Sequence, residues 1–238
     1  MNTFIFDLDG TLLPMPDQNL FLNLYMKNLS KKMLSQGMEA EKTMNALLAG
    51  TQAMIENDGS MTNEERFWSV FTSILGETAR KLEEFFDQYY RNEFIAAKNS
   101  TGIHPLAKEC IQTLKDKGYT VVLATNPIFP RIATLTRIEW AGLNHDDFSL
   151  ITTYENSSYC KPNLNYYENI LTLINKQPSE CIMIGNDVRD DMCAAALGME
   201  TFLLKDCLIC SDDEDITGYP QGDFMDLKRM IDELPIIC

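Results

Sequence analysis

The chain has 238 residues, with 20 Lys and Arg against 35 Asp and Glu, which gives a formal charge of -15 at pH 7. This length is enough for one substantial hydrophobic core together with a second, smaller domain. The negative charge disfavours nucleic acids and anionic membrane surfaces as partners, and with no leader-like or membrane-spanning apolar run in the sequence we expect a cytoplasmic protein.

The first predicted element is a short buried strand that ends on two acids. The apolar run Phe4–Phe6 leads directly into Asp7 and Asp9, and Gly10 follows. A buried parallel strand places polar groups at its carboxyl end, where the backbone leaves the sheet and meets solvent or a ligand. Because two carboxylates this close repel each other, they indicate a cation beside them.

A long helical segment comes next. Between about residues 15 and 100 no strand pattern is found, and four amphipathic helical patterns lie at 19–34, 40–56, 63–76 and 79–94. Thr62 and Glu65 fit a capping box before the third of these. A segment of this length is too large for a loop, so we expect an inserted helical domain of residues 15–100 that covers the edge beside Asp7 and Asp9 as a lid.

Strands and helices alternate through the rest of the chain. Strands are predicted at Tyr119–Thr125, Phe148–Thr153, Cys181–Gly185 and Glu200–Leu204, and helical patterns at 105–118, 129–143, 164–175 and 190–198. This alternation predicts a three-layer, doubly wound α/β fold with a mostly parallel sheet. We expect residues 1–14 and 101–238 to form this core domain.

The last part of the chain carries a cysteine pair and an acidic run. Cys207 and Cys210 are two of seven cysteines, and an odd number of scattered cysteines is typical of reduced thiols. Both histidines lie in other segments, so we interpret the pair as two small apolar residues and not as a metal or redox site. The run Ser211–Asp223 is expected to be a solvated surface segment before a last helix at Leu227–Leu234.

Polar side chains also follow the later strands of the predicted sheet. They are Thr125 and Asn126 after the second strand, Lys161 after the third, and Asp187, Asp190 and Asp191 after the fourth. The carboxyl ends of parallel strands meet in one crevice, so we expect all of them close to the two acids of the first strand. Carboxylate oxygens in such a pocket suit Mg²⁺, while Lys161 and Thr125 could hold the oxygens of a substrate phosphate.

The segments DLDGT, LATN, CKPN and GNDVRDD resemble, in this order and at strand ends, the four motifs of the haloacid dehalogenase superfamily. The resemblance covers the core from Asp7 to Leu204, and the helical insertion stands where phosphatases of that superfamily carry a type 1 α-helical cap. The first motif is specific, and the other three gain weight from their order. The resemblance implies a Rossmann-like core, phosphoryl-transfer chemistry and a Mg²⁺ cofactor.

The resemblance also assigns roles to the motif residues. Asp7 would be the nucleophile that forms an aspartyl-phosphate, and Asp9 would act first as general acid and then as general base. Thr125 and Lys161 would bind the phosphoryl oxygens, and Lys161 would also offset the charge on Asp7. Backbone amides of the turn at Leu8–Gly10 could donate to the phosphate, since glycine permits close approach there.

Asp7, the backbone carbonyl of Asp9 and Asp187 would hold the metal according to the same resemblance. The fourth motif commonly has an aspartate directly after its glycine, whereas Asn186 takes that position here. We favour Asp187 as the ligand, with Asp191 as the second-shell residue or alternative ligand. The other interpretation is that Asn186 occupies the usual ligand position and a later acid of the motif compensates.

The acid at position 9 separates the reactions that the resemblance allows. Dehalogenases of the superfamily attack carbon and carry no acid there, so we favour hydrolysis of a small phosphorylated metabolite, with Asn126 touching the substrate or orienting its loop. A phosphomutase and a non-catalytic phosphate-binding regulator are the alternatives. Arg66, Arg80, Arg91 and Arg131 could meet a second anionic group of the substrate, but we interpret them as surface charges. Trp68 and the aromatic residues at 85–90 could line an apolar substrate pocket, but we interpret them as core packing.

Overall fold

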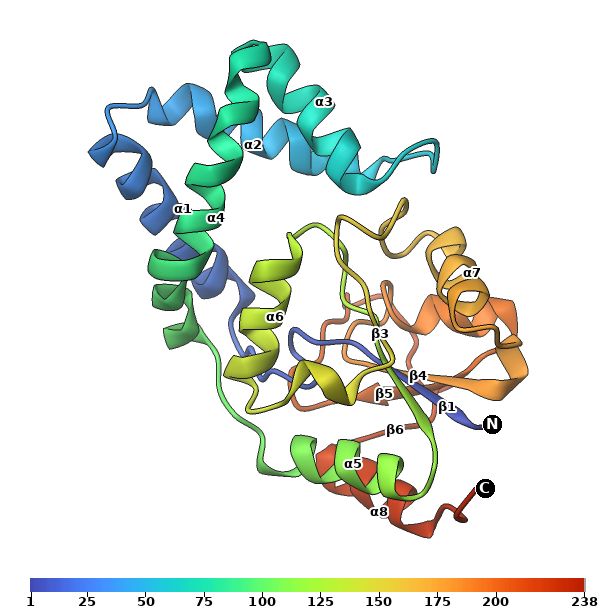
Figure 1. Cartoon of the computed structure of the whole chain (residues 1–238). Helices are drawn as coiled ribbons and strands as arrows, with labels where there is room; N and C mark the ends of the chain where they lie inside the picture. The colour runs from blue at the N-terminus through green and yellow to red at the C-terminus, as the bar shows by residue number, and fades with distance from the viewer. Residues whose placement is uncertain (238) are drawn as a thin grey trace.

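The computed structural model describes residues 1–237, which fold around a six-stranded sheet (Figure 1). Its strands are β1 (Thr3–Phe6), β2 (Thr120–Leu123), β3 (Leu150–Ile151), β4 (Cys181–Gly185), β5 (Glu200–Leu204) and β6 (Gln221–Gly222). They lie in the order β3-β2-β1-β4-β5-β6, and every neighbouring pair is parallel. This confirms the predicted doubly wound α/β fold, in which β1 occupies the middle of the sheet.

Helices cover both faces of the sheet. On one face lie α5 (Pro105–Asp116) and α8 (Phe224–Glu233), side by side, and on the other lie α7 (Leu164–Leu173) and the 3₁₀ helix η5 (Met192–Leu197) (Figure 1). Side chains alternate between the faces along β1, because Phe4 and Phe6 pack in the cluster of α5 and α8 while Ile5 packs in that of α7. The core of the domain is therefore hydrophobic on both sides of its central strand.

The segment between β1 and α5 is helical throughout the described residues, apart from its connections. It contains α1 (Gln18–Ser35), α2 (Ala40–Ile55), α3 (Asn63–Leu75) and α4 (Leu82–Asn92), with the 3₁₀ helices η1 (Glu77–Lys81) and η2 (Glu93–Ser100). The capping box predicted at Thr62 and Glu65 is present at the start of α3. The two ends of this insertion meet, since the Gly102 N–H donates to the Pro14 carbonyl (2.9 Å).

The connection from β2 to β3 runs through α6 (Arg131–Trp140) and the 3₁₀ helix η3 (His145–Asp147), and η4 (Pro178–Glu180) precedes β4. Helix α4 of the insertion packs against α6. None of the helices in the described part of the chain is both long and apolar enough to cross a membrane.

The segment after β5 differs in part from the prediction of a solvated excursion. Its end forms β6, because the Leu203 N–H donates to the Pro220 carbonyl (2.8 Å) and the Lys205 N–H to the Gly222 carbonyl (2.9 Å). The last helix begins earlier than expected, at Phe224, because the Asp223 side chain accepts hydrogen bonds from the first turn. A two-residue strand at the edge of the sheet leaves too short a pattern for sequence periodicity to detect.

Candidate active site

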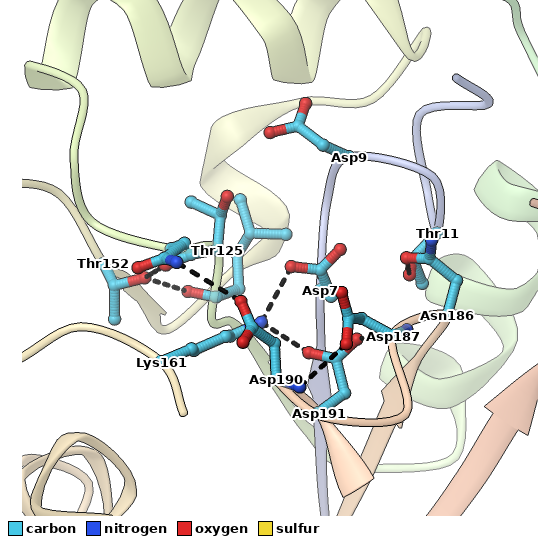
Figure 2. A network of polar contacts seen from close by, with 12 residues as sticks. Asp7, Asp9, Thr11, Thr125, Thr152, Lys161, Asn186, Asp187, Asp190 and Asp191 are labelled. Carbon is cyan, nitrogen blue, oxygen red and sulfur yellow. Dashed lines mark hydrogen bonds and ion pairs between the residues drawn. The ribbon is translucent and has the colours of Figure 1, made fainter. Parts of the chain in front are cut away.

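The carboxyl ends of β1, β2 and β4, with the loop after β3, surround a pocket of about 250 Å³, which we call the polar pocket (Figure 2). All predicted site residues except Leu8 and Gly10 line it. They are Asp7, Asp9, Thr125, Asn126, Lys161, Asp187 and Asp191, and Asp190 lines it as well. Gln18, Phe21 and Leu22 of α1 line its other side, so the insertion does cover the strand ends. Leu8 directs its side chain into the hydrophobic core.

Gly10 shapes the turn that follows β1. Its φ of +87° lies in the left-handed region, and a Cβ there would stand 2.4 Å from Nδ2 of Asn186, so this position accepts only glycine. Its N–H donates to the Leu13 carbonyl (2.8 Å). The structure therefore corrects the expectation that Gly10 itself donates to phosphate. Within the described residues the N–H groups of Leu8 and Asp9 have no acceptor and are the free donors of this turn.

Asn186 is held at both ends of its amide. The Thr11 hydroxyl donates to Oδ1 of Asn186 (2.8 Å), and Nδ2 of Asn186 donates to the Cys207 carbonyl (2.7 Å). The side chain is buried and fastens the β1 turn to the loop after β5. Because its oxygen already accepts a hydrogen bond from a threonine, Asn186 fits a structural role better than that of a metal ligand.

Lys161 lies at the centre of a buried charge cluster. Its Nζ is 2.8 Å from Oδ1 of Asp7 and 2.6 Å from Oδ1 of Asp191, and the side chains of Lys161 and Asp191 are each 1% exposed. Burial alone would lower the pKa of Lys161, but the carboxylates of Asp191 and Asp7 outweigh it and hold that pKa well above its usual value. The ammonium group therefore stays charged beside Asp7 at any physiological pH.

The acids after β4 differ in how many of their carboxylate oxygens already have a hydrogen-bond or ion-pair partner. Asp191 uses both oxygens, since Oδ1 pairs with Lys161 and Oδ2 accepts from the Asp187 N–H (3.0 Å). Asp187 uses Oδ1 to accept from the N–H groups of Arg189 (2.8 Å) and Asp190 (2.9 Å), which leaves its Oδ2 free within the described residues. Burial and the neighbouring Asp187 raise the pKa of Asp190.

Asp9 is paired with an arginine that the sequence analysis did not single out. Arg137 of α6 is 1% exposed, and its Nη1 donates to Oδ2 of Asp9 in a short ion pair. Its guanidinium also lies 4.5 Å from the centroid of the Phe129 ring and donates to Oγ1 of Thr134 (3.4 Å). Burial raises the pKa of Asp9, while Arg137 opposes that shift and Asp7 adds to it. The other oxygen, Oδ1, is buried without a partner in the described residues.

Thr125 is positioned through its backbone. Its carbonyl accepts from the hydroxyls of Thr152 and Tyr166, both at 2.8 Å, and these two hydroxyls lie 3.0 Å apart. Among the hydrogen bonds of the described residues none involves the Thr125 hydroxyl itself, so this group is available to a ligand. Asn126 donates from Nδ2 to Oδ2 of Asp190 (3.4 Å), and its buried Oδ1 has no partner in the same part of the chain.

The oxygen donors at this pocket fit a hard divalent cation. Within residues 1–237 no cluster of three His, Cys, Asp or Glu side chains is close enough to share a metal. Mg²⁺ needs fewer, because it keeps several waters and takes one or two carboxylates with a substrate phosphate. Asp7 and Asp187 each have one oxygen outside the hydrogen bonds above, and no N–H of the described turn donates to the Asp9 carbonyl.

The residues that sequence analysis missed lie on helices and not at strand ends. Arg137 had one detectable signal, because it shares the buried face of α6 with Ala133, Thr134 and Ile138, where a charged residue is out of pattern. Tyr166 is one of several tyrosines in a buried helix face and gave no signal, since its hydroxyl meets Thr125 only in the folded chain.

A family model described as haloacid dehalogenase-like hydrolase matches residues 1–198. The chain is 23% identical over 209 residues to a ribulose-1,5-bisphosphate 5-phosphatase of Halopiger xanaduensis, covering 84% of this chain and 82% of the relative. It is 25% identical over 207 residues to a glyceraldehyde 3-phosphate phosphatase of Methanothermobacter thermautotrophicus, covering 86% of each. A crystal structure described as a HAD phosphatase from Thermococcus onnurineus superposes with a TM-score of 0.60 at 17% identity over 100% of both chains, which shows the same fold.

Proposed function

The chain belongs to the haloacid dehalogenase-like hydrolases, and from that premise we propose that it is a Mg²⁺-dependent phosphatase acting on a small phosphomonoester in the cytoplasm. In this proposal residues 15–100 form a cap domain over a core of residues 1–14 and 101–238. The phosphatase names of two relatives support the reaction type. The observation that carries the proposal is the buried ion pair between Lys161 and Asp7 at the end of β1.

Asp7 is the proposed nucleophile. Its carboxylate attacks phosphorus, forms an aspartyl-phosphate and releases the alcohol, and water then hydrolyses this intermediate to free phosphate. Lys161 stays charged beside Asp7 and offsets the negative charge that an approaching phosphate adds. The Thr125 hydroxyl and the free N–H groups of Leu8 and Asp9 are placed to donate to the phosphoryl oxygens.

Asp9 is the proposed general acid and base. Its raised pKa favours the protonated form that the leaving alcohol requires, and after departure of the alcohol its carboxylate can take a proton from water. Arg137 holds one of its oxygens and leaves the other unpaired. We therefore infer that Arg137 positions Asp9 without contacting the substrate.

Asp7, Asp187 and the Asp9 carbonyl are the groups that would hold Mg²⁺. When bound, Mg²⁺ supplies positive charge that polarises the phosphoryl group and shields the attacking carboxylate. Asp191 is left to orient Lys161, because both of its oxygens are already occupied.

The proposal is tested by phosphate release from 4-nitrophenyl phosphate and from propyl phosphate, with Mg²⁺ and with EDTA. Asp7→Asn should lower turnover of both esters by at least about 10³-fold. Asp9→Asn should affect propyl phosphate more than the aryl ester, by part of the roughly 10²–10⁴-fold typical of general acid–base catalysis, since only the alkoxide needs a proton to leave.

The control is Asp146→Asn, which changes an exposed acid far from the strand ends and should keep full activity. Circular dichroism should show that all three variants remain folded. Release that persists unchanged in Asp7→Asn would contradict the aspartyl-phosphate route.

A further inference from the structure

A second and larger hollow lies beside the polar pocket. It has a volume of about 840 Å³ and is enclosed by α2, α3 and α4 of the insertion, by α6 and by the loops after β2 and β3. We call it the aromatic cavity, because six aromatic side chains line it: Tyr25, Phe67, Trp68, Phe86, Tyr90 and Tyr154. Trp68, Phe86 and Tyr90 therefore line a hollow as well as packing in the core, which was their predicted role.

The two hollows adjoin each other. Ile128, in the loop that follows Thr125 and Asn126, lines both of them. Helix α1 contributes Phe21 to the polar pocket and Tyr25, one turn later, to the aromatic cavity. A phosphate bound in the polar pocket would therefore have its ester oxygen close to the entrance of the cavity.

The size of the cavity limits what it can receive. The polar pocket, at about 250 Å³, has less than a third of the cavity's volume and must hold the phosphoryl group together with its cation and waters. The cavity falls within the range of roughly 300–1,000 Å³ that is usual for pockets holding drug-sized ligands. A three-carbon alcohol would fill only a small part of it and would bury few of the aromatic faces.

The charges of the wall argue against a second anionic group. Five carboxylates line the cavity: Glu64, Glu83, Asp87, Glu139 and Glu155. Three guanidinium groups stand against them, those of Arg91 and Arg131 in the wall and that of Arg80 stacked 4.3 Å from the Trp68 ring. Most of this positive charge is already used, since Arg80 pairs with Glu64 and Glu83, and Arg91 with Asp87.

Glu155 strengthens this point. Its Oε1 accepts a hydrogen bond from the backbone N–H of Arg131 (2.7 Å), and its Oε2 is buried without a partner among residues 1–237. An anion brought into the cavity would meet this carboxylate and an excess of negative charge, at a cost that rises as water is excluded. A neutral or cationic ring would instead meet aromatic edges and faces.

We propose that the aromatic cavity receives the alcohol part of the substrate, and that this alcohol carries an aromatic ring and no second anionic group. The inference rests on the proposed phosphatase function, which places the phosphate in the polar pocket. It distinguishes this chain from the two curated relatives, whose names refer to a sugar bisphosphate and to a three-carbon sugar phosphate.

Three esters of primary alcohols test the proposal, because their leaving groups have similar intrinsic reactivity. They are propyl phosphate, 3-phenylpropyl phosphate and 3-carboxypropyl phosphate, compared by kcat/KM in the presence of Mg²⁺. We expect the phenyl ester to exceed the propyl ester by at least about tenfold, and the carboxylate ester to fall below it. Binding of the same three esters to Asp7→Asn, measured by calorimetry, gives a second readout that needs no turnover.

A matched pair of variants locates the effect. Thr136 lines the cavity from α6, and its hydroxyl donates to the Ile132 carbonyl (2.8 Å), four residues earlier. Thr172 is exposed on α7 and makes the same bond to the Glu168 carbonyl (2.9 Å). Thr136→Phe fills the cavity and should bring the phenyl-to-propyl ratio close to 1, whereas Thr172→Phe should leave that ratio unchanged.

The outcomes separate this inference from the proposed function. Hydrolysis of all three esters without a phenyl preference, or with a preference that Thr136→Phe does not reduce, overturns the inference and leaves the phosphatase intact. Phenyl-selective binding to Asp7→Asn without any turnover by the wild type overturns the phosphatase and retains the cavity as a binding site. Neither turnover nor selective binding overturns both.

Discussion

The polar pocket and the aromatic cavity share the side chain of Ile128 but differ in how their walls are stabilised. In the polar pocket the buried charges of Lys161, Asp7 and Asp191 are paired with one another. In the cavity the ion pairs are exposed, as for Arg91 and Asp87, with side chains 65% and 49% exposed. Loss of a charge should therefore destabilise the fold more in the polar pocket than in the wall of the cavity.

The largest expected effect comes from removing the central cation of the polar pocket. Lys161→Met leaves the carboxylates of Asp7 and Asp191 buried and unpaired, so we expect a loss of about 3–5 kcal/mol in the free energy of unfolding. Urea denaturation followed by circular dichroism measures it. Arg91→Met, which removes an ion pair from the cavity wall, is the matched control and should change stability little. Equal losses in the two variants would contradict the view that the ion pairs of the polar pocket stabilise the fold more than those of the cavity wall.

The polar pocket was predictable because its residues follow strand ends. Asp7, Thr125 and Asp187 stand one or two residues after a strand, and Lys161 stands in the loop that follows β3. Parallel strands bring such positions to one edge of the sheet. The glycine of the first motif also determines the turn after β1, because Gly10 adopts a positive φ there. The fold followed from the same alternation of strands and helices.

The aromatic cavity was not predictable, because its wall is assembled from the faces of several helices. Trp68 and Tyr154 are far apart in sequence, and their meeting depends on the angle at which the insertion packs on the core. Aromatic residues that recur every three or four positions along a helix give the same sequence pattern whether they face a packed core or a cavity. Arg137 escaped prediction for a related reason, since its partner Asp9 lies 128 residues away.

The second effect concerns Arg137, whose removal tests whether the rule of paired charges extends to Asp9. Arg137→Met should lower the free energy of unfolding by about 1–3 kcal/mol near neutral pH, less than for Lys161 because the Asp9 side chain is 23% exposed and can be partly hydrated. Arg131→Met, an exposed position on the same helix, is the control.

The stability difference between wild type and Arg137→Met should depend on pH, and the pKa of Asp9 sets the direction of that dependence. Burial raises the pKa of Asp9, so the folded chain holds a proton that the unfolded chain loses, and this group's contribution to stability falls as pH rises through the raised pKa. Loss of Arg137 removes an opposing attraction and raises that pKa further. The gap between wild type and Arg137→Met should therefore be wider near pH 7.5 than near pH 4.5. A gap that stays constant with pH would show that Arg137 acts through packing alone, and a gap that narrows as pH rises would contradict the proposed effect on the pKa of Asp9.

The smallest expected effect is on the contact that holds the insertion over both hollows. Asn63, at the start of α3, is buried and donates from Nδ2 to the Pro127 carbonyl (3.1 Å) and to Sγ of Cys160 (3.4 Å). Its N–H donates to the Ser157 carbonyl (2.7 Å). Opening of the insertion would break these bonds and expose the Cys160 thiol, so labelling of Cys160 reports that motion.

Cys110 supplies an internal reference, because it is buried on α5, a helix outside the insertion that packs against α8. Burial raises the pKa of both thiols to about 12, so the two differ in access and not in acidity. Asn63→Ala should speed maleimide labelling of Cys160 by about tenfold and leave Cys110 unchanged. Asn28→Ala, which removes only a hydrogen bond within α1, is the control.

Mg²⁺ with a phosphate analogue should slow labelling of Cys160, because a ligand in the polar pocket favours the closed position of the insertion. Equal labelling rates of the two cysteines in every case would mean that the insertion opens only when the whole chain unfolds.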